Sequence, residues 1–234
     1  MKISKQTIQL LSNCAKIRES INFGAGNQIR TKDSSQAFNA IIEIDEEFPR
    51  DFCVYDLNSF IAALKIFNEP EIEFKASNMV IKDSNGKAKI NYAYTNPILI
   101  QVISDYSKSI SLDNKICTFS LTNAQFNELS SAASLFGVDD IEFRAVTKET
   151  ILVTATTSSG IKRDTDNSYS VSIDVDVEDF DKFTELNIST MKSLLKLMPL
   201  DYDVSIYAYR PQTYMLEFVD ETQKIKYYAG AKVL

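Results

Sequence analysis

The sequence predicts an α+β protein made of two similar domains, each with an antiparallel sheet and two helices. Most of the chain alternates apolar and polar residues, as half-buried strands do, while four segments have a helical period instead. Their order repeats, because two helices with their strands precede a connector and two more helices with strands follow it. We expect domains at 1–94 and 115–234, joined by a connector at 95–114.

The strand segments are the clearest local pattern. In the first half we expect strands at 38–44, 71–75 and 87–92, the last two flanking a hairpin at Ser84, Asn85 and Gly86. In the second half the same alternation occurs at 141–146, 168–177, 204–209, 215–219 and 224–229. We find no convincing residue identity between the halves, so the repeat is one of architecture.

Four segments predict helices, at 4–18, 57–67, 123–136 and 188–198. Each begins at a residue that can accept a hydrogen bond from the first free backbone N–H groups: Ser4, Asp56, Thr122 and Asn187. The connector at 95–114 contains Pro97 and an apolar patch, and it predicts an extended linker.

Composition excludes several classes of chemistry. The chain has no histidine, so Ser-His and Cys-His nucleophile pairs are impossible, and without a C-x-x-C motif a structural zinc site lacks ligands. Cys14, Cys53 and Cys117 are far apart in sequence and are expected to be buried thiols of a reducing compartment. The chain has no apolar run near the ~20 residues of a membrane helix and no signal peptide, so we expect a soluble, intracellular protein.

The charges are segregated. The whole chain has a net charge of −7, yet the segments 2–18, 57–67, 123–136 and 188–198 contain only one acid, Glu128. Their basic residues are Lys2, Lys5, Lys16, Arg18, Lys65, Lys192 and Lys196. This pattern predicts a basic surface formed by the helices and an acidic surface formed by sheets and loops.

Helical geometry places these cations on one side of each helix. Lys2, Lys5, Gln9, Ser12 and Lys16 fall within about 80° of arc, away from the apolar stripe. Asn58 and Lys65 share a face of the second helix, and Lys192 and Lys196 flank the apolar stripe of the fourth. These faces lack aromatic side chains and a base-reading set, so the expected contact is with duplex phosphates, independent of sequence. The alternative is that they are solvated faces with incidental lysines.

Two short stretches carry a family resemblance. The opening MKISKQT, followed by Leu10 and Leu11, and the segment VYDLNSF at 54–60 resemble the sliding clamps of T-even-type bacteriophages, with matching spacing. The similarity is clear over roughly the first 70 residues, and beyond them it consists of length, helix order and the two-part layout.

The resemblance implies the DNA clamp fold, with three subunits forming a closed ring whose helices line the hole. It further implies a non-enzymatic protein without a metal or cofactor, acting in the cytoplasm of the infected bacterial host. The implied partners are duplex DNA, a DNA polymerase, an ATP-dependent clamp loader and late-transcription factors. The expected DNA-facing residues are Lys2, Lys5, Gln9, Lys16, Asn58, Lys65, Lys192 and Lys196. The third helix departs from the pattern, because it offers Asn127, Ser130, Ser131 and Ser134 with Glu128 and no cation.

The resemblance also implies an apolar pocket that docks a short peptide of the polymerase. The candidates are the connector residues Ile98, Leu99 and Ile100 with Tyr207, Tyr209, Pro211 and Tyr228 of the second domain, since aromatic residues are frequent anchors. Ordinary sheet and linker packing is the alternative for each of them.

Two other functions fit parts of the sequence. A metal-dependent phosphodiesterase could use Asp139, Asp140, Asp174, Asp176, Glu178, Asp179, Asp181, Asp201 and Asp203 as oxygen ligands. Many of these acids are spaced by two, as on a solvated strand face, and no base or nucleophile accompanies them. A scaffold protein of antiparallel sheets that binds only other proteins would also be acidic and rich in tyrosine.

Overall fold

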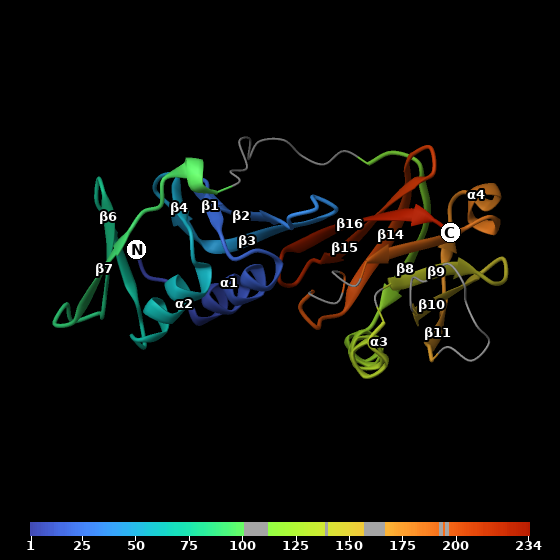
Figure 1. Ribbon diagram of the computed structural model, residues 1–234, viewed down its shortest axis with the longest axis horizontal. Helices are drawn as coiled ribbons and strands as arrows, with labels where there is room; N and C mark the ends of the chain where they lie inside the picture. The colour runs from blue at the N-terminus through green and yellow to red at the C-terminus, as the bar shows by residue number, and fades with distance from the viewer. Residues whose placement is uncertain (101–111, 139, 157–166, 192–193, 195–196) are drawn as a thin grey trace. The chain divides into compact units, whose positions relative to one another are not determined.

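The computed structural model describes the chain except for residues 101–111, 139, 157–166, 192–193 and 195–196 (Figure 1). The chain forms two compact units. Unit 1 comprises Met1–Ser109 and Gln223–Ile225, and unit 2 comprises Ile110–Thr222 and Lys226–Leu234. Antiparallel sheets dominate both units, and each contains two α-helices among its described residues. The predicted α+β class is confirmed.

The helices of unit 1 are α1 (Lys5–Ile17) and α2 (Leu57–Lys65), and they lie side by side (Figure 1). Both begin where the sequence predicts, because the side chain of Ser4 accepts a hydrogen bond from Thr7 N and that of Asp56 accepts one from Ser59 N. Their apolar stripes are buried, and the polar residues on the opposite faces are exposed, among them Lys5, Gln9, Asn58 and Lys65.

The strands of unit 1 pair antiparallel. β1 (Ile21–Phe23) pairs with β4 (Phe52–Val54), and β2 (Gly26–Lys32) pairs with β3 (Phe38–Phe48). A further sheet has the order β5 (Glu71–Phe74), β6 (Asn78–Lys82), β7 (Lys89–Ala93). Rings of these strands and of α2 pack together in the core: Phe23, Phe48, Phe52, Phe60 and Phe74.

The predicted hairpin at 84–86 exists, but its first strand is different. β6 precedes the turn and pairs with β7, whereas the predicted strand at 71–75 corresponds to β5, on the other side of β6. Met79, Val80 and Ile81 are consecutive buried residues. A strand buried on both faces does not alternate apolar and polar residues, so the sequence pattern does not predict it.

Unit 2 is built on one large sheet with the strand order β11-β10-β9-β13-β16-β15-β14-β8-β12. The bounds are β8 (Lys115–Leu121), β9 (Asp140–Ala145), β10 (Thr150–Thr156), β11 (Tyr169–Asp174), β12 (Asp176–Val177), β13 (Asn187–Met191), β14 (Tyr202–Arg210), β15 (Thr213–Asp220) and β16 (Ile225–Val233). Tyr202, Phe218 and Tyr227 are fully buried in its core, where the Tyr202 ring contacts the other two edge to face.

Helix α3 (Asn123–Phe136) packs against β10 and β11. Thr122 and Gln125 form a capping box at its start, which confirms the predicted cap. Gly137 ends the helix in the left-handed conformation with φ 63°, a geometry that a residue without Cβ adopts at little cost. The second helix of unit 2, α4 (Phe180–Thr184), is short and is capped by Asp179.

The predicted helix at 188–198 is wrong for its first residues. Asn187, expected to cap a helix, begins strand β13, which pairs with β9 on one side and β16 on the other. Ile188, Ser189 and Thr190 are all buried there, and the Thr190 hydroxyl donates to Gly230 O at 3.0 Å. Tertiary pairing of the backbone on both sides therefore overrides the helical spacing of Ile188, Met191 and Leu194.

The connector is also not extended at its start. Pro97–Leu99 form a 3₁₀ turn, and the side chain of Asn96 accepts a hydrogen bond from Ile98 N. Proline at the first position of the turn has its φ preset and needs no N–H partner there. Residues 101–111 of the connector lie outside the described part of the chain.

Candidate nucleic-acid interface

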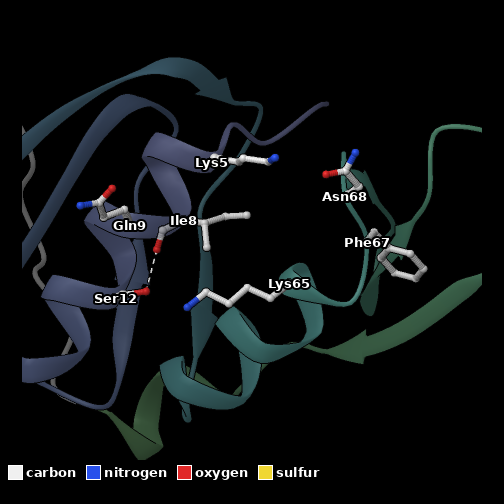
Figure 2. Close-up of a pocket in the computed structure, with 7 residues that line it drawn as sticks. All are labelled: Lys5, Ile8, Gln9, Ser12, Lys65, Phe67 and Asn68. Carbon is white, nitrogen blue, oxygen red and sulfur yellow. Dashed lines mark hydrogen bonds between the residues drawn. The ribbon is translucent and has the colours of Figure 1, made fainter.

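The two helices of unit 1 enclose an open hollow of about 460 Å³. Figure 2 shows its lining, with Lys5, Ile8, Gln9 and Ser12 supplied by α1 and Lys65 by α2, followed by Phe67 and Asn68. Three residues that the sequence assigned to separate helices, Lys5, Gln9 and Lys65, thus lie around one hollow. Residues 18–56, which include β1 to β4, separate the two helices in the chain, so it is the fold of unit 1 that brings these side chains together.

The hollow is positively charged. Among the described residues, its lining contains two lysines and no carboxylate. Within the described part of the chain, the ion pairs include neither Lys5 nor Lys65. The Ser12 hydroxyl is already engaged, since it donates to Ile8 O at 2.8 Å. The two ammonium groups on neighbouring helices can therefore attract an anionic ligand.

The other predicted residues of unit 1 lie outside this hollow. Lys16 and Asn58 are exposed on α1 and α2. Lys2 precedes α1 and is not helical, because it forms an isolated β-bridge with Glu71, and its ammonium lies 3.7 Å from the carboxylate of Glu69. The Lys2 ammonium group therefore already has an acidic partner within unit 1.

Local structure gives some of these lysines a second role. Lys16 and Lys65 lie in the last turns of α1 and α2, where a cation interacts favourably with the free carbonyl groups.

At the opposite end of α1, the Glu46 carboxylate accepts hydrogen bonds from Ser4 N and the Thr7 hydroxyl, both at 2.5 Å. Partial burial acts to raise the pKa of Glu46, but these hydrogen bonds outweigh it and hold the pKa below its usual value.

Helix α3 presents a different surface. Its exposed residues include Asn127, Glu128, Ser131 and Ser134, and the Asn127 amide donates to the Asn123 side chain at 2.8 Å. Glu128 accepts a hydrogen bond from the Tyr169 hydroxyl of β11. The exposed face of α3 therefore carries no lysine or arginine, as the sequence predicts.

Two predicted DNA-facing residues, Lys192 and Lys196, lie outside the described residues. The neighbouring Leu194, Leu197 and Met198 are buried.

The residues proposed for a peptide pocket differ in exposure. Ile98 and Leu99 are strongly exposed on the 3₁₀ turn of unit 1, and Ile100 is half-buried. In unit 2, Tyr209 and Pro211 are exposed, whereas Tyr207 and Tyr228 are buried. The Tyr207 hydroxyl donates to Glu217 at 2.9 Å.

Several acids of the rival metal site have structural partners. Asp179 caps α4, Asp201 accepts a hydrogen bond from Asn123 N at 2.6 Å, and Ser120 donates to Asp203 at 3.1 Å. Glu178 pairs with Lys115 at 3.3 Å. Among the described residues, no group of three or more potential ligands could hold a metal ion.

The three cysteines are buried, as predicted, and burial raises the pKa of the Cys14 and Cys117 thiols to about 12.

No described helix has the length and apolar character needed to cross a membrane.

Comparison with known proteins identifies the relatives of this chain. The sliding clamp of Vibrio phage KVP40 is 27% identical over 211 residues, covering 88% of this chain and 90% of the relative. The sliding clamps of Escherichia phage RB69 and Enterobacteria phage T4 are 36% and 29% identical over 69 and 97 residues, or 30% and 42% of each chain. The chain is thus similar to a phage sliding clamp along most of its length. No protein-family model matches it.

The fold of this chain also has a counterpart among solved structures. The crystal structure of proliferating cellular nuclear antigen from Entamoeba histolytica matches with a TM-score of 0.66 at 15% identity, covering 99% of this chain and 97% of the other. At that identity the likeness concerns the fold. The resemblance to phage clamps predicted from the sequence is confirmed.

Proposed function

We propose that this protein is a sliding clamp that encircles duplex DNA and tethers a replicative DNA polymerase for processive synthesis. The observation that carries the proposal is the similarity to a phage sliding clamp along nearly the whole chain. The hollow between α1 and α2 supports the DNA-binding part, because it groups two cations in a protein with a net charge of −7.

A closed ring explains how weak contacts with DNA can keep the protein on the duplex. We infer a closed ring of three copies, in which the helices face the duplex. A closed ring cannot leave DNA sideways, even when each lysine–phosphate contact is weak and breaks freely, and freely broken contacts permit sliding. Closure keeps a bound polymerase at high effective concentration near the primer end.

The proposed partners follow from the same function. They are duplex DNA, a DNA polymerase, an ATP-dependent clamp loader and late-transcription factors, in the cytoplasm of the infected host. The role is non-enzymatic and uses no cofactor. For the peptide pocket, the exposed Ile98, Leu99, Tyr209 and Pro211 remain the accessible candidates.

The test measures the mass of the oligomer and its retention on circular and linear DNA. Native mass spectrometry should detect a discrete oligomer of three chains. After loading, the protein should stay on nicked circular DNA and leave linear DNA by its ends. A monomer, or equal retention on circular and linear DNA, contradicts the proposal.

A further inference from the structure

We propose that the hollow between α1 and α2 binds an acidic peptide segment of a protein partner, anchored by one large apolar side chain, and that this segment competes with DNA for Lys5 and Lys65. The competition rests on the proposed function, whereas the peptide binding does not.

The apolar part of the hollow carries the inference. The side chain of Ile8, which is mostly buried, points into the space between the helices, and Phe67 also lines the hollow (Figure 2). A duplex presents phosphates and sugars outward and keeps its bases stacked inside, so it offers the lysines an anion but gives Ile8 and Phe67 no large apolar group. The volume of about 460 Å³ suits a bulky side chain and lies within the usual range of binding pockets.

The charges define the rest of the ligand. Lys5 and Lys65 lie on different helices on either side of Ile8 (Figure 2), and no carboxylate of the described residues lines the hollow. A peptide with carboxylates on both sides of an aromatic residue can pair with both ammonium groups while the ring covers Ile8. The side-chain amides of Gln9 and Asn68 can form hydrogen bonds with the peptide backbone.

The probe is a fluorescein-labelled peptide, Gly-Asp-Asp-Phe-Asp-Asp-Gly, followed by fluorescence anisotropy. We expect Phe67→Ser to weaken its binding about tenfold, the cost of losing an apolar anchor contact. Lys5→Gln with Lys65→Gln should weaken it similarly. Ile66→Ser is the matched control, because Ile66 is exposed in the same turn but does not line the hollow. Circular dichroism checks that each variant is folded.

The outcomes separate the two proposals. Ile66→Ser should leave both peptide binding and retention on circular DNA unchanged, and excess nicked circular DNA should displace the peptide. Equal binding of a peptide with serine in place of phenylalanine, or no effect of Phe67→Ser, means charge attraction alone and overturns the inference. Phenylalanine-dependent binding by a protein that is not retained on circular DNA would instead overturn the proposed function.

Discussion

The α1–α2 surface of unit 1 and the α3 surface of unit 2 are built alike but charged differently. A hydroxyl side chain caps α1 and α3, and a carboxylate accepts from a backbone N–H at each start: Glu46 for α1 and Asp201 for α3. Yet Lys5 and Lys65 are exposed on the first surface, and Glu128 is the charged residue of α3. Forming and placing a helix therefore does not require exposed cations, and Lys5, at the start of α1 where the helix dipole does not favour a cation, needs a separate explanation.

The largest effect should come from reversing the charge of the α1–α2 surface. Lys5→Glu with Lys65→Glu should reduce retention on nicked circular DNA at least about tenfold, because two attractive phosphate contacts per subunit become repulsive. Dissociation at several salt concentrations measures it.

The control is Lys87→Glu with Lys148→Glu, which changes the total charge equally at exposed residues in bends between strands. Equal losses in the two double variants would mean that bulk charge, and not the α1–α2 surface, attracts the DNA.

Because α1 and α3 are capped in the same way, removing either cap should cost a similar amount of stability, and its effect should be smaller than that of the charge reversal. Ser4→Ala and Thr122→Ala should each destabilise the protein by about 1 kcal/mol, because each removes an N-cap acceptor. Denaturant unfolding measures the loss. The salt dependence of DNA retention should stay unchanged in both, and a change confined to Ser4→Ala would link the cap of α1 to DNA contact.

A cation added to α3 should make the two surfaces more alike. Ser131→Lys, at an exposed position, should steepen the salt dependence of DNA binding by about 0.9 per new phosphate contact. Ser131→Gln controls for side-chain length. No difference between the lysine and glutamine variants would place α3 away from the phosphates.

Local signals predicted the helices of unit 1 and α3 well. Ser4, Asp56 and Thr122 are true caps because a cap depends on neighbours within one turn. The exposure of Lys5 and Gln9 follows from the helical period alone. The presence of Phe67 and Asn68 beside Lys5 could not be predicted in this way, since it depends on how α1 packs against α2.

Two errors in the predicted elements have identifiable physical causes. Asn187 and Ile188 have helical spacing with the residues that follow, but β9 and β16 offer backbone partners on both sides. The strand β6 was missed because Met79, Val80 and Ile81 are all buried and do not alternate. For β13 the deciding information lies in distant parts of the chain, whereas β6 pairs with its sequence neighbours β5 and β7 and was missed only because it is buried on both faces.

The smallest effect concerns the acid that holds the start of α1. The pKa of Glu46 is lowered in the folded state, so its hydrogen bonds to Ser4 and Thr7 stabilise unit 1 above the ordinary carboxyl pKa of 4.5, and this contribution is lost as the pH falls through the lower folded value. Glu46→Gln should therefore flatten the acid side of the stability curve, whereas Glu47→Gln, at its exposed neighbour, should not. Hydrogen exchange of the α1 amides between pH 3 and 6, an interval of about 1.5 units on either side of that pKa, measures the effect separately from α3. Equal pH dependence in the two variants would show that the acid sensitivity of α1 does not come from the carboxylate at its start.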